Sequence, residues 1–481
     1  MNLKHKIFGG VAWNAIGLVI DNGLHLIVKL ILARLLVPEV FGIIGFATVF
    51  IGMIQVFGDL GMTAALIQRK DKNLNPIDYD TAYWAGIAWA FFLAAVLSFI
   101  IGPIAASFYN EEMLLTIIPV LSISLVSRNL IAVHIVNVTR QLDFKKIVLP
   151  RNLSRIFASA VAITMALTGF GVWSLVFQSV VSDILLIFIY SYVSPWRPTM
   201  RFSRDSFKNI FSFGVYTTGT NIFNYLTGNI DYLLIGKILG AHSLGIYSLG
   251  YNVTYVVRGQ IMNVINSVFF PVYSKLQDDL ETTKRYYFRV IKYNCIIIYP
   301  LMIGIILLAE PLVIYGLGTK WIEAIIPMQL MAAAGLIHLL TSSNTVLLRG
   351  MGKPKLELIF SIIKTLGVNV PLIVLGVYFY GIIGAAAGLL AAKTIIFFIN
   401  NIILRKVVGI KFSEILGNAG TLFLLTICTA VSVLVVKDYF ILGGIFVVYL
   451  VLHFKISFQD IKQILIVYKE RKGNAVIIES E

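Results

Sequence analysis

Three ionisable side chains lie one helical turn apart in an apolar stretch near the start of the chain. Asp21, His25 and Lys29 recur every four residues within VAWNAIGLVIDNGLHLIVKLILARLL, residues 11–36. Together with Asn14 they share one face of a helix, over about 22 Å along its axis. An acid and an imidazole can exchange H⁺ or bind Na⁺, and an amine can neutralise an anion. We therefore expect this face to line a wetted cavity. Alternatively, His25 pairs with Asp21 or with Lys29, each four residues away on the same helix, and these side chains only neutralise each other.

Other polar side chains fall inside apolar stretches farther along the chain. A charge near the centre of a bilayer costs about 3 kcal/mol, so such residues are candidates for function. Cations there can bind phosphate oxygens, and carboxylates can bind a coupling ion. The expected substrate-binding residues are Lys29, Arg258, Lys364, Lys393 and Asn224, and the expected ion-coupling residues are Asp21, His25, Asp59 and Asp231.

Several of these charged side chains also have an interpretation without function. Lys364 and Arg155 lie within a few turns of a span end, where a long side chain can reach the interface. Arg128 is equally consistent with either role, whereas packing or pairing is the simpler interpretation of Asp183 and His134. No group of His, Cys or acidic residues has the spacing of a metal site, and Cys295 and Cys428 lie in apolar runs.

The composition of the chain indicates that these ionisable residues lie in membrane-spanning segments. The chain has 481 residues, of which 58% are hydrophobic and 13% charged, with a mean hydropathy of +0.87. Soluble globular proteins carry about 25% charged residues. Long apolar runs with short polar turns predict an all-α polytopic membrane protein and not a β-barrel.

We predict fourteen membrane-spanning helices. Their expected ranges are about 8–34, 40–67, 81–108, 113–137, 152–169, 171–194, 209–236, 243–272, 286–309, 324–348, 356–378, 380–404, 415–436 and 438–454. Of the 39 Lys and Arg, 29 then fall on one side of the membrane, 4 on the other and 6 within spans. The positive-inside rule places both termini in the cytoplasm.

The net charge of +15 is spread over many short loops, which argues against a nucleic-acid-binding protein. No loop is long enough to fold as a separate domain. A membrane enzyme usually exposes its catalytic residues on such a domain, so we expect no enzymatic activity.

Two pairs of stretches in the chain resemble each other, the first pair at a constant offset of 203 residues. ILARLLVPEVFGIIGFATV (31–49) aligns with LIGKILGAHSLGIYSLGYN (234–252), and GFGVW (169–173) matches YFYGII (378–383), with Gly171 over Gly381. The sequence therefore predicts two six-helix lobes related by a parallel repeat, with a central cavity between them. The expected parts are an N-terminal lobe (1–208), a C-terminal lobe (209–411), helices 13 and 14 (412–454) and a cytoplasmic tail (455–481).

Three stretches resemble a known family: LARLLVPEVFGIIGFATVFIGMIQVFGDLGMTAALIQRKD (32–71), FFPVYSKLQDD (269–279) and RGMGKPKLEL (349–358). They are similar to the Wzx-type oligosaccharide flippases of the multidrug/oligosaccharidyl-lipid/polysaccharide exporter (MOP) superfamily. The resemblance covers essentially the whole chain. It implies a two-lobed transporter that works by alternating access.

The resemblance also implies a substrate, a location and partners. The substrate would be an oligosaccharide on undecaprenyl diphosphate, moved from the cytoplasmic to the periplasmic leaflet of the bacterial inner membrane for surface polysaccharide assembly. We expect a monomer with no cofactor other than H⁺ or Na⁺, in contact with membrane lipids and with a polysaccharide polymerase and chain-length proteins as possible partners. A cation-coupled multidrug exporter of the same superfamily, a membrane polymerase or ligase, and an inert scaffold are the alternatives.

Overall fold

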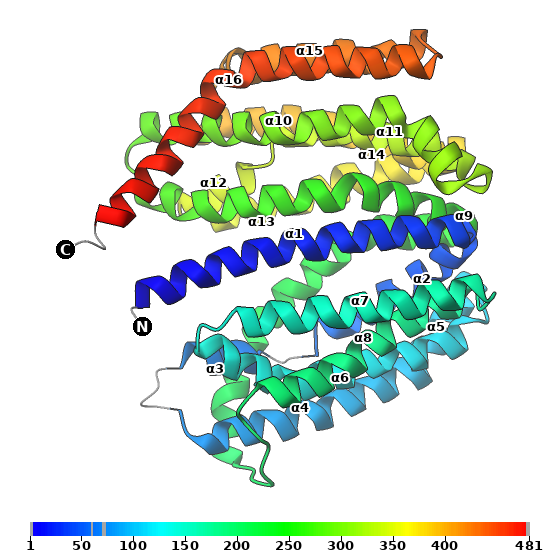
Figure 1. The fold of residues 1–481 in the computed structure, drawn as a ribbon, viewed down its shortest axis with the longest axis vertical. Helices are drawn as coiled ribbons and strands as arrows, with labels where there is room; N and C mark the ends of the chain where they lie inside the picture. The colour runs from blue at the N-terminus through cyan, green and yellow to red at the C-terminus, as the bar shows by residue number, and fades with distance from the viewer. Residues whose placement is uncertain (1–2, 59–60, 70–73, 478–481) are drawn as a thin grey trace. The chain divides into compact units, whose positions relative to one another are not determined.

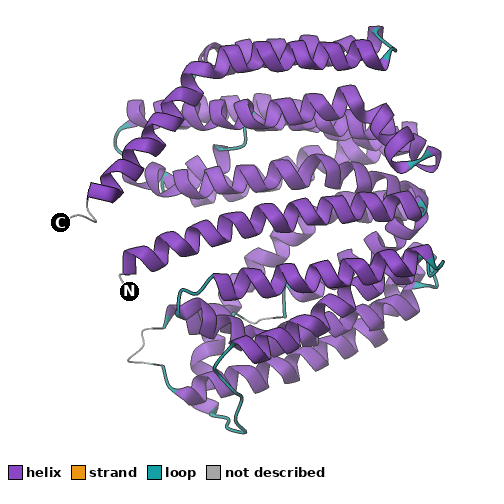
Figure 2. Ribbon diagram, in the orientation of Figure 1, coloured by secondary structure: helices purple, strands orange, loops and turns teal. Residues whose placement is uncertain are grey.

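The structure is a computed structural model that describes residues 3–58, 61–69 and 74–477, with only the backbone described for some helical residues, among them 209–224. The chain is 88% helical, and Figure 2 shows no strand in the described ranges. This confirms the predicted all-α fold class.

Contacts divide the chain into two compact units. Unit 1 comprises residues 1–249 and 316–321, and unit 2 comprises 250–315 and 322–481. The lobe boundaries expected from the sequence stay a prediction.

Helices of unit 1 follow one another with short turns (Figure 1). They are α1 (Leu3–Leu35), α2 (Pro38–Gln55), α3 (Met62–Gln68), α4 (Pro76–Val96), the π-helical turn η2 (Leu97–Ile101), α5 (Gly102–Tyr109), α6 (Leu114–Arg140), α7 (Lys145–Leu167), α8 (Val172–Val193) and the first part of α9 (Arg204–Lys275). α7 packs between α1 and α8, and α6 packs against α4 and α8. Their apolar faces bury small residues such as Ala158 and Ala162, which lets the helices approach closely.

Unit 2 contains the remaining helices. They are the rest of α9, then α10 (Leu280–Pro311), η3 (Leu312–Leu317), η4 (Thr319–Ala324), α11 (Ile325–Leu339), α12 (Asn344–Gly350), α13 (Pro354–Ile362), η5 (Ile363–Asn369), α14 (Val370–Val407), α15 (Phe412–Val435) and α16 (Tyr439–Ile477). α10 forms the centre of its core and packs against α11, α15 and α16. Hydroxyl and amide groups buried in this core pair with each other, as in the 2.6 Å bond that Tyr287 donates to Asn344.

Nine helical segments in the described part of the chain are long and apolar enough to cross a membrane. Two continuous helices contain sharp kinks, at Gly240 in α9 (φ 79°) and at Tyr380 and Gly381 in α14. The kink at Gly240 falls at the predicted turn between the spans 209–236 and 243–272, so α9 holds two of the predicted spans. The kink at Tyr380 and Gly381 falls at the start of the predicted span 380–404, and the span before it begins in α13. The total of fourteen stays a prediction.

The internal repeat is visible in the backbone. Gly171 has φ 54° and ψ −123°, and Gly381, its expected equivalent, has φ 55° and ψ −133°. A positive φ of this kind favours glycine, because a side chain would clash with the backbone. The two glycines therefore terminate equivalent turns in the same way.

Two further equivalent positions meet each other inside unit 1. Glu39 on α2 and His242 on α9 are separated by the repeat offset of 203 residues, and the His242 Nδ1 lies 2.6 Å from the Glu39 Oε1. A Cβ on Gly42 would collide with the Ala241 carbonyl, and one on Gly245 with the Pro38 carbonyl. The backbones of α2 and α9 thus touch where the start of α2 crosses α9. The residues at this crossing, Glu39 with His242 and Gly42 with Gly245, are equivalent positions of the two repeats.

Candidate functional site

The charged face of α1 is bound to α7. Arg155 Nη1 donates to the Asp21 Oδ1, and Arg151 Nε lies 3.8 Å from the Asp21 Oδ2. Asp21 is buried, and the side chain of Arg155 is 34% exposed. The sequence suggested His25, on the same helix, as the partner of Asp21, and the arginines of α7 were not predicted. The two arginines lie one turn apart on α7, so both can contact the Asp21 carboxylate.

A polar cavity of about 370 Å³ lies beside this ion pair, wholly within unit 1. α1, α2, α6, α7 and α8 supply its walls. The charged or titratable groups that line it are His25, Arg128, Arg155 and Asp183, and its amides are Gln55 and Gln178. Four serines and Thr48 add hydroxyl groups. Of the predicted site residues, His25 therefore lines this cavity. The other charged residues there, Arg128, Arg155 and Asp183, were not among the predicted site residues.

The other candidates in unit 1 have different surroundings. Lys29 is half-buried, with its Nζ 6.0 Å from the centroid of the Phe41 ring. Asp231 is buried and accepts a 2.8 Å hydrogen bond from the Tyr247 hydroxyl. Asp59 lies outside the described residues, as does the side chain of Asn224.

In unit 2 the three predicted cations belong to one cluster. His338 on α11 lies within electrostatic range of Lys393 on α14, Arg258 on α9 and Lys364 on η5. Lys364 also stacks over Phe360, with its Nζ 5.8 Å from the ring centroid. His338 thus faces the positive charges of three residues that belong to three other helical segments. We name Arg258, His338, Lys364 and Lys393 the cationic cluster. His338 is not among the site residues expected from the sequence.

Arg258 is the most buried member of this cluster, at 7% exposure. Its guanidinium lies 5.5 Å from the Tyr255 ring centroid and against Gly335, where a Cβ would meet Nη1. Its buried Nε has no hydrogen-bond partner among the described residues. A buried guanidinium with an unused donor is well suited to bind an oxyanion.

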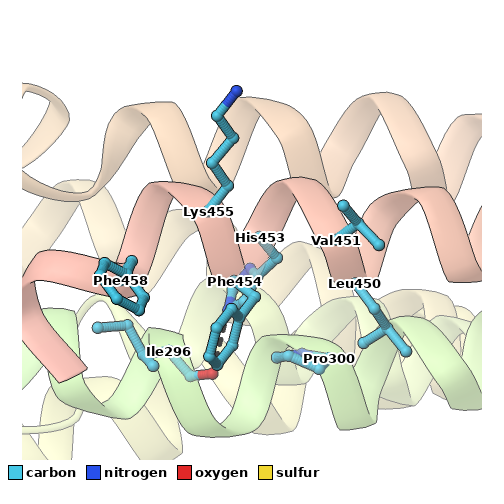
Figure 3. A pocket seen from close by; sticks show the side chains of 8 residues that line it. All are labelled: Ile296, Pro300, Leu450, Val451, His453, Phe454, Lys455 and Phe458. Carbon is cyan, nitrogen blue, oxygen red and sulfur yellow. Dashed lines mark hydrogen bonds between the residues drawn. The ribbon is translucent and has the colours of Figure 1, made fainter. Parts of the chain in front are cut away.

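An apolar groove of about 710 Å³ lies elsewhere in unit 2, between α10 and α16 (Figure 3). Its walls are Ile296, Pro300, Leu450, Phe454 and Phe458, with few polar atoms. The one imidazole there, His453, is already bound to the Ile296 carbonyl at 3.0 Å and to the Tyr449 hydroxyl at 3.2 Å. The groove therefore offers mainly hydrocarbon contacts, together with the exposed ammonium of Lys455 on α16.

Metal chemistry finds no support in the described ranges, where no group of three His, Cys, Asp or Glu side chains comes together. The polar groups that do gather are suited to reversible binding of a ligand with charges and hydroxyl groups.

Comparisons with known proteins identify the family. A family model described as "Polysaccharide biosynthesis protein" matches residues 31–326. The lipopolysaccharide biosynthesis protein WzxC of Escherichia coli K12 is 27% identical over 433 residues, covering 89% of this chain and 85% of that protein. The succinoglycan biosynthesis transport protein ExoT of Rhizobium meliloti is 25% identical and covers 71% and 69%.

Solved structures share the fold. The lipid II flippase MurJ in an inward closed conformation superposes with a TM-score of 0.72 at 15% identity, covering 94% of this chain and 99% of that one. An inward-facing multidrug resistance MATE family transporter of the MOP superfamily gives a TM-score of 0.63 at 16% identity, covering 83% and 98%.

Proposed function

The chain belongs to the polysaccharide biosynthesis protein family, and from this premise we propose that it is a flippase for a lipid-linked oligosaccharide. The substrate is an oligosaccharide carried on undecaprenyl diphosphate. The protein moves it from the cytoplasmic to the periplasmic leaflet by alternating access, for assembly of a surface polysaccharide. The names of the relatives, which include a lipopolysaccharide biosynthesis protein and a succinoglycan transport protein, support this proposal.

One structural observation carries the proposal. Of the cationic cluster, His338, Lys364 and Lys393 lie in helical segments that are apolar enough to span a membrane, and Arg258 follows another such segment (Tyr225–Tyr255) on α9. Uncompensated charge is costly in such surroundings. A diphosphate would offset that cost, because phosphate oxygens accept charge-assisted hydrogen bonds from guanidinium and ammonium groups. We assign Arg258, Lys364 and Lys393 to diphosphate binding. Lys29 and Asn224 complete the substrate-binding residues expected from the sequence.

Ion coupling is the second part of the proposal. Asp21, His25, Asp59 and Asp231 are the carboxylates and imidazole expected to exchange H⁺ or Na⁺ as the protein changes state. Support comes from their chemistry and from the position of His25 on the wall of the unit 1 cavity. Transport that is unchanged after the proton and sodium gradients collapse would remove this role.

The chain is a multi-pass membrane protein. We place it in the bacterial inner membrane with both termini in the cytoplasm, because 29 of its 39 Lys and Arg lie on one side. A monomer suffices for the activity. A polysaccharide polymerase and chain-length proteins are the expected partners.

Deletion of the gene tests the flippase assignment. The deletion strain should accumulate undecaprenyl-linked oligosaccharide on the cytoplasmic side and should lose its surface polymer. Arg258→Ala and Lys364→Ala should fail to restore the polymer, whereas Arg201→Ala, at an exposed loop arginine, should restore it. Intact polymer in the deletion strain would refute the proposal. Polymer restored by both cluster variants would refute the assignment of the cations.

A further inference from the structure

Two opposite charges face the unit 1 cavity without closing an ion pair. Arg128 on α6 and Asp183 on α8 attract each other electrostatically. Neither forms a hydrogen bond or an ion pair within 4.0 Å in the part of the chain that the structure describes. Arg128 is exposed and Asp183 half-buried, so both present polar atoms to the cavity.

Both charges lie deep in the predicted membrane. Arg128 is near the middle of α6 (Leu114–Arg140), and Asp183 is near the middle of α8 (Val172–Val193). At 1.5 Å per residue, Arg128 lies about 20 Å from either end of its helix. Charges at such depth are costly unless water or a ligand satisfies them.

The remaining walls offer a mixture of amide, hydroxyl and hydrocarbon groups. The Gln55 Nε2 lies 3.4 Å from the Ser124 hydroxyl, and the Gln178 Nε2 lies 3.3 Å from the Ser159 hydroxyl. Neither amide oxygen has a hydrogen-bond partner among the described residues, so both can act as acceptors there. Ile44, Ile51, Leu121 and Leu175 provide apolar surface between these polar groups.

We propose that this cavity is a sugar-binding subsite, in which Arg128 and Asp183 hold hydroxyl groups of one ring of the oligosaccharide. The inference rests on the proposed function and extends it to the glycan. A sugar hydroxyl both donates and accepts, so a guanidinium and a carboxylate that line the same cavity match it. The apolar walls fit the C–H faces of the ring.

The carboxylate separates this site from a phosphate site. Asp183 would repel a diphosphate, whereas the cationic cluster in unit 2 has no carboxylate among its four members. The volume of about 370 Å³ is at the lower end for small-molecule sites, so the cavity takes part of the oligosaccharide and not all of it. Each unit thus recognises a different part of the substrate: unit 1 the sugar and unit 2 the diphosphate.

Binding to the full-length protein in nanodiscs tests the subsite with two lipid probes. One is undecaprenyl diphosphate, and the other is the undecaprenyl-diphosphate-linked oligosaccharide extracted from the deletion strain. The wild-type protein should bind the second probe more tightly. Arg128→Gln and Asp183→Asn should each weaken binding of the second probe about tenfold or more, as expected for loss of a hydrogen bond to a charged group. Binding of undecaprenyl diphosphate should stay within twofold.

Matched substitutions and the first probe serve as controls. Arg201→Gln and Asp205→Asn make the same chemical changes at exposed positions and should alter neither affinity. Retained binding of undecaprenyl diphosphate shows that the cavity variants are folded. If the cavity variants bind both probes more weakly to the same extent, the cavity is a phosphate site. If they still bind the linked oligosaccharide more tightly than undecaprenyl diphosphate by the wild-type factor, the cavity does not bind the sugar. Either result overturns the subsite but not the proposed function. A wild-type protein that binds neither probe would overturn the proposed function and the subsite with it.

Discussion

At the scale of single residues, Asp21 shows how a charged side chain in a membrane helix is stabilised. Its carboxylate lies against two arginines of α7, so the charge on α1 is compensated across a helix interface. The same contact holds α1 against α7 near the unit 1 cavity. Pairing and ion exchange are different roles for this carboxylate, and mutations can separate them.

The losses of stability from removing either partner of the Asp21–Arg155 pair should not be additive. Asp21→Asn leaves Arg155 without its carboxylate, and Arg155→Gln leaves Asp21 with only the more distant Arg151, each at a cost of about 2 kcal/mol. The double variant should lose less than the sum of the two single losses. Thermal unfolding of all four proteins in one detergent measures this coupling, with Asp205→Asn as a surface control. Additive losses would contradict the pairing.

Gly335 leaves room for the Arg258 guanidinium. A side chain there would meet Nη1 of Arg258 and the Met302 sulfur. Gly335→Val should therefore displace Arg258 and reduce polymer formation about as much as Arg258→Ala, although every charge is retained. Gly443→Val on α16, where an added Cβ meets no atom within 4 Å, is the matched control. Normal polymer with Gly335→Val would show that the position of Arg258 is not critical.

At the scale of elements, side chains hold the ends of short helices in place. Arg140, at the end of α6, donates from Nη1 to the carbonyls of Leu66, Ile67 and Arg69, at 2.6, 3.2 and 2.9 Å. Leu66 and Ile67 belong to the last turn of α3, where carbonyls have no partners within the helix, and Arg69 directly follows this helix. A positive charge is favourable at this end of a helix.

Arg140→Gln should loosen α3 without affecting distant helices. Loss of a charge-assisted contact at a helix end costs about 1–2 kcal/mol. Amide hydrogen exchange should speed up in Met62–Gln68 and stay unchanged in Phe412–Val435 of α15. Uniform acceleration in both helices would instead indicate global destabilisation.

The crossing of α2 and α9 depends on two glycines. A Cβ at Gly42 or Gly245 would overlap a backbone carbonyl of the other helix, which cannot move aside as a side-chain tip can. Gly42→Ala and Gly245→Ala should each destabilise unit 1 by about 1–3 kcal/mol through overpacking. Gly443→Ala on α16 should have little effect. Unfolding midpoints of the three variants, compared with that of the wild type, give the answer.

The sequence predicts well those features that depend on local patterns along the chain, such as the helical fold class. The helical class follows from apolar runs, and the repeat was visible in Gly171 and Gly381, which adopt the same unusual backbone conformation. Family membership also follows, since the matched range 31–326 contains two of the three stretches that carried the resemblance.

The site was harder to predict, because its contacts join distant segments. Arg155 lies 134 residues from Asp21, and no spacing within α1 could reveal it. Arg128 and Asp183 each appeared as isolated charges, and only the fold brings both to one cavity. A charge census finds the ionisable residues in membrane helices but not their neighbours.

At the scale of the whole molecule, the repeat and the charge distribution make one joint prediction about the membrane. An even number of spans in each repeat puts both repeats in the same orientation. Equivalent turns at Gly171 and Gly381 must then face the same side of the membrane. The basic loops predict that this side is the periplasm.

Cysteine labelling in intact cells tests this topology. Cys295 and Cys428 are first replaced by Ser and Ala, and single cysteines are then introduced at Phe170, Tyr380, Arg201 and Lys411, which are all exposed. A thiol reagent that cannot cross the inner membrane should label Phe170→Cys and Tyr380→Cys. Arg201→Cys and Lys411→Cys should react only after the cells are opened. The two turns belong to equivalent positions of the repeat, so labelling of one without the other would contradict the parallel repeat, whereas reversal of all four would contradict only the orientation.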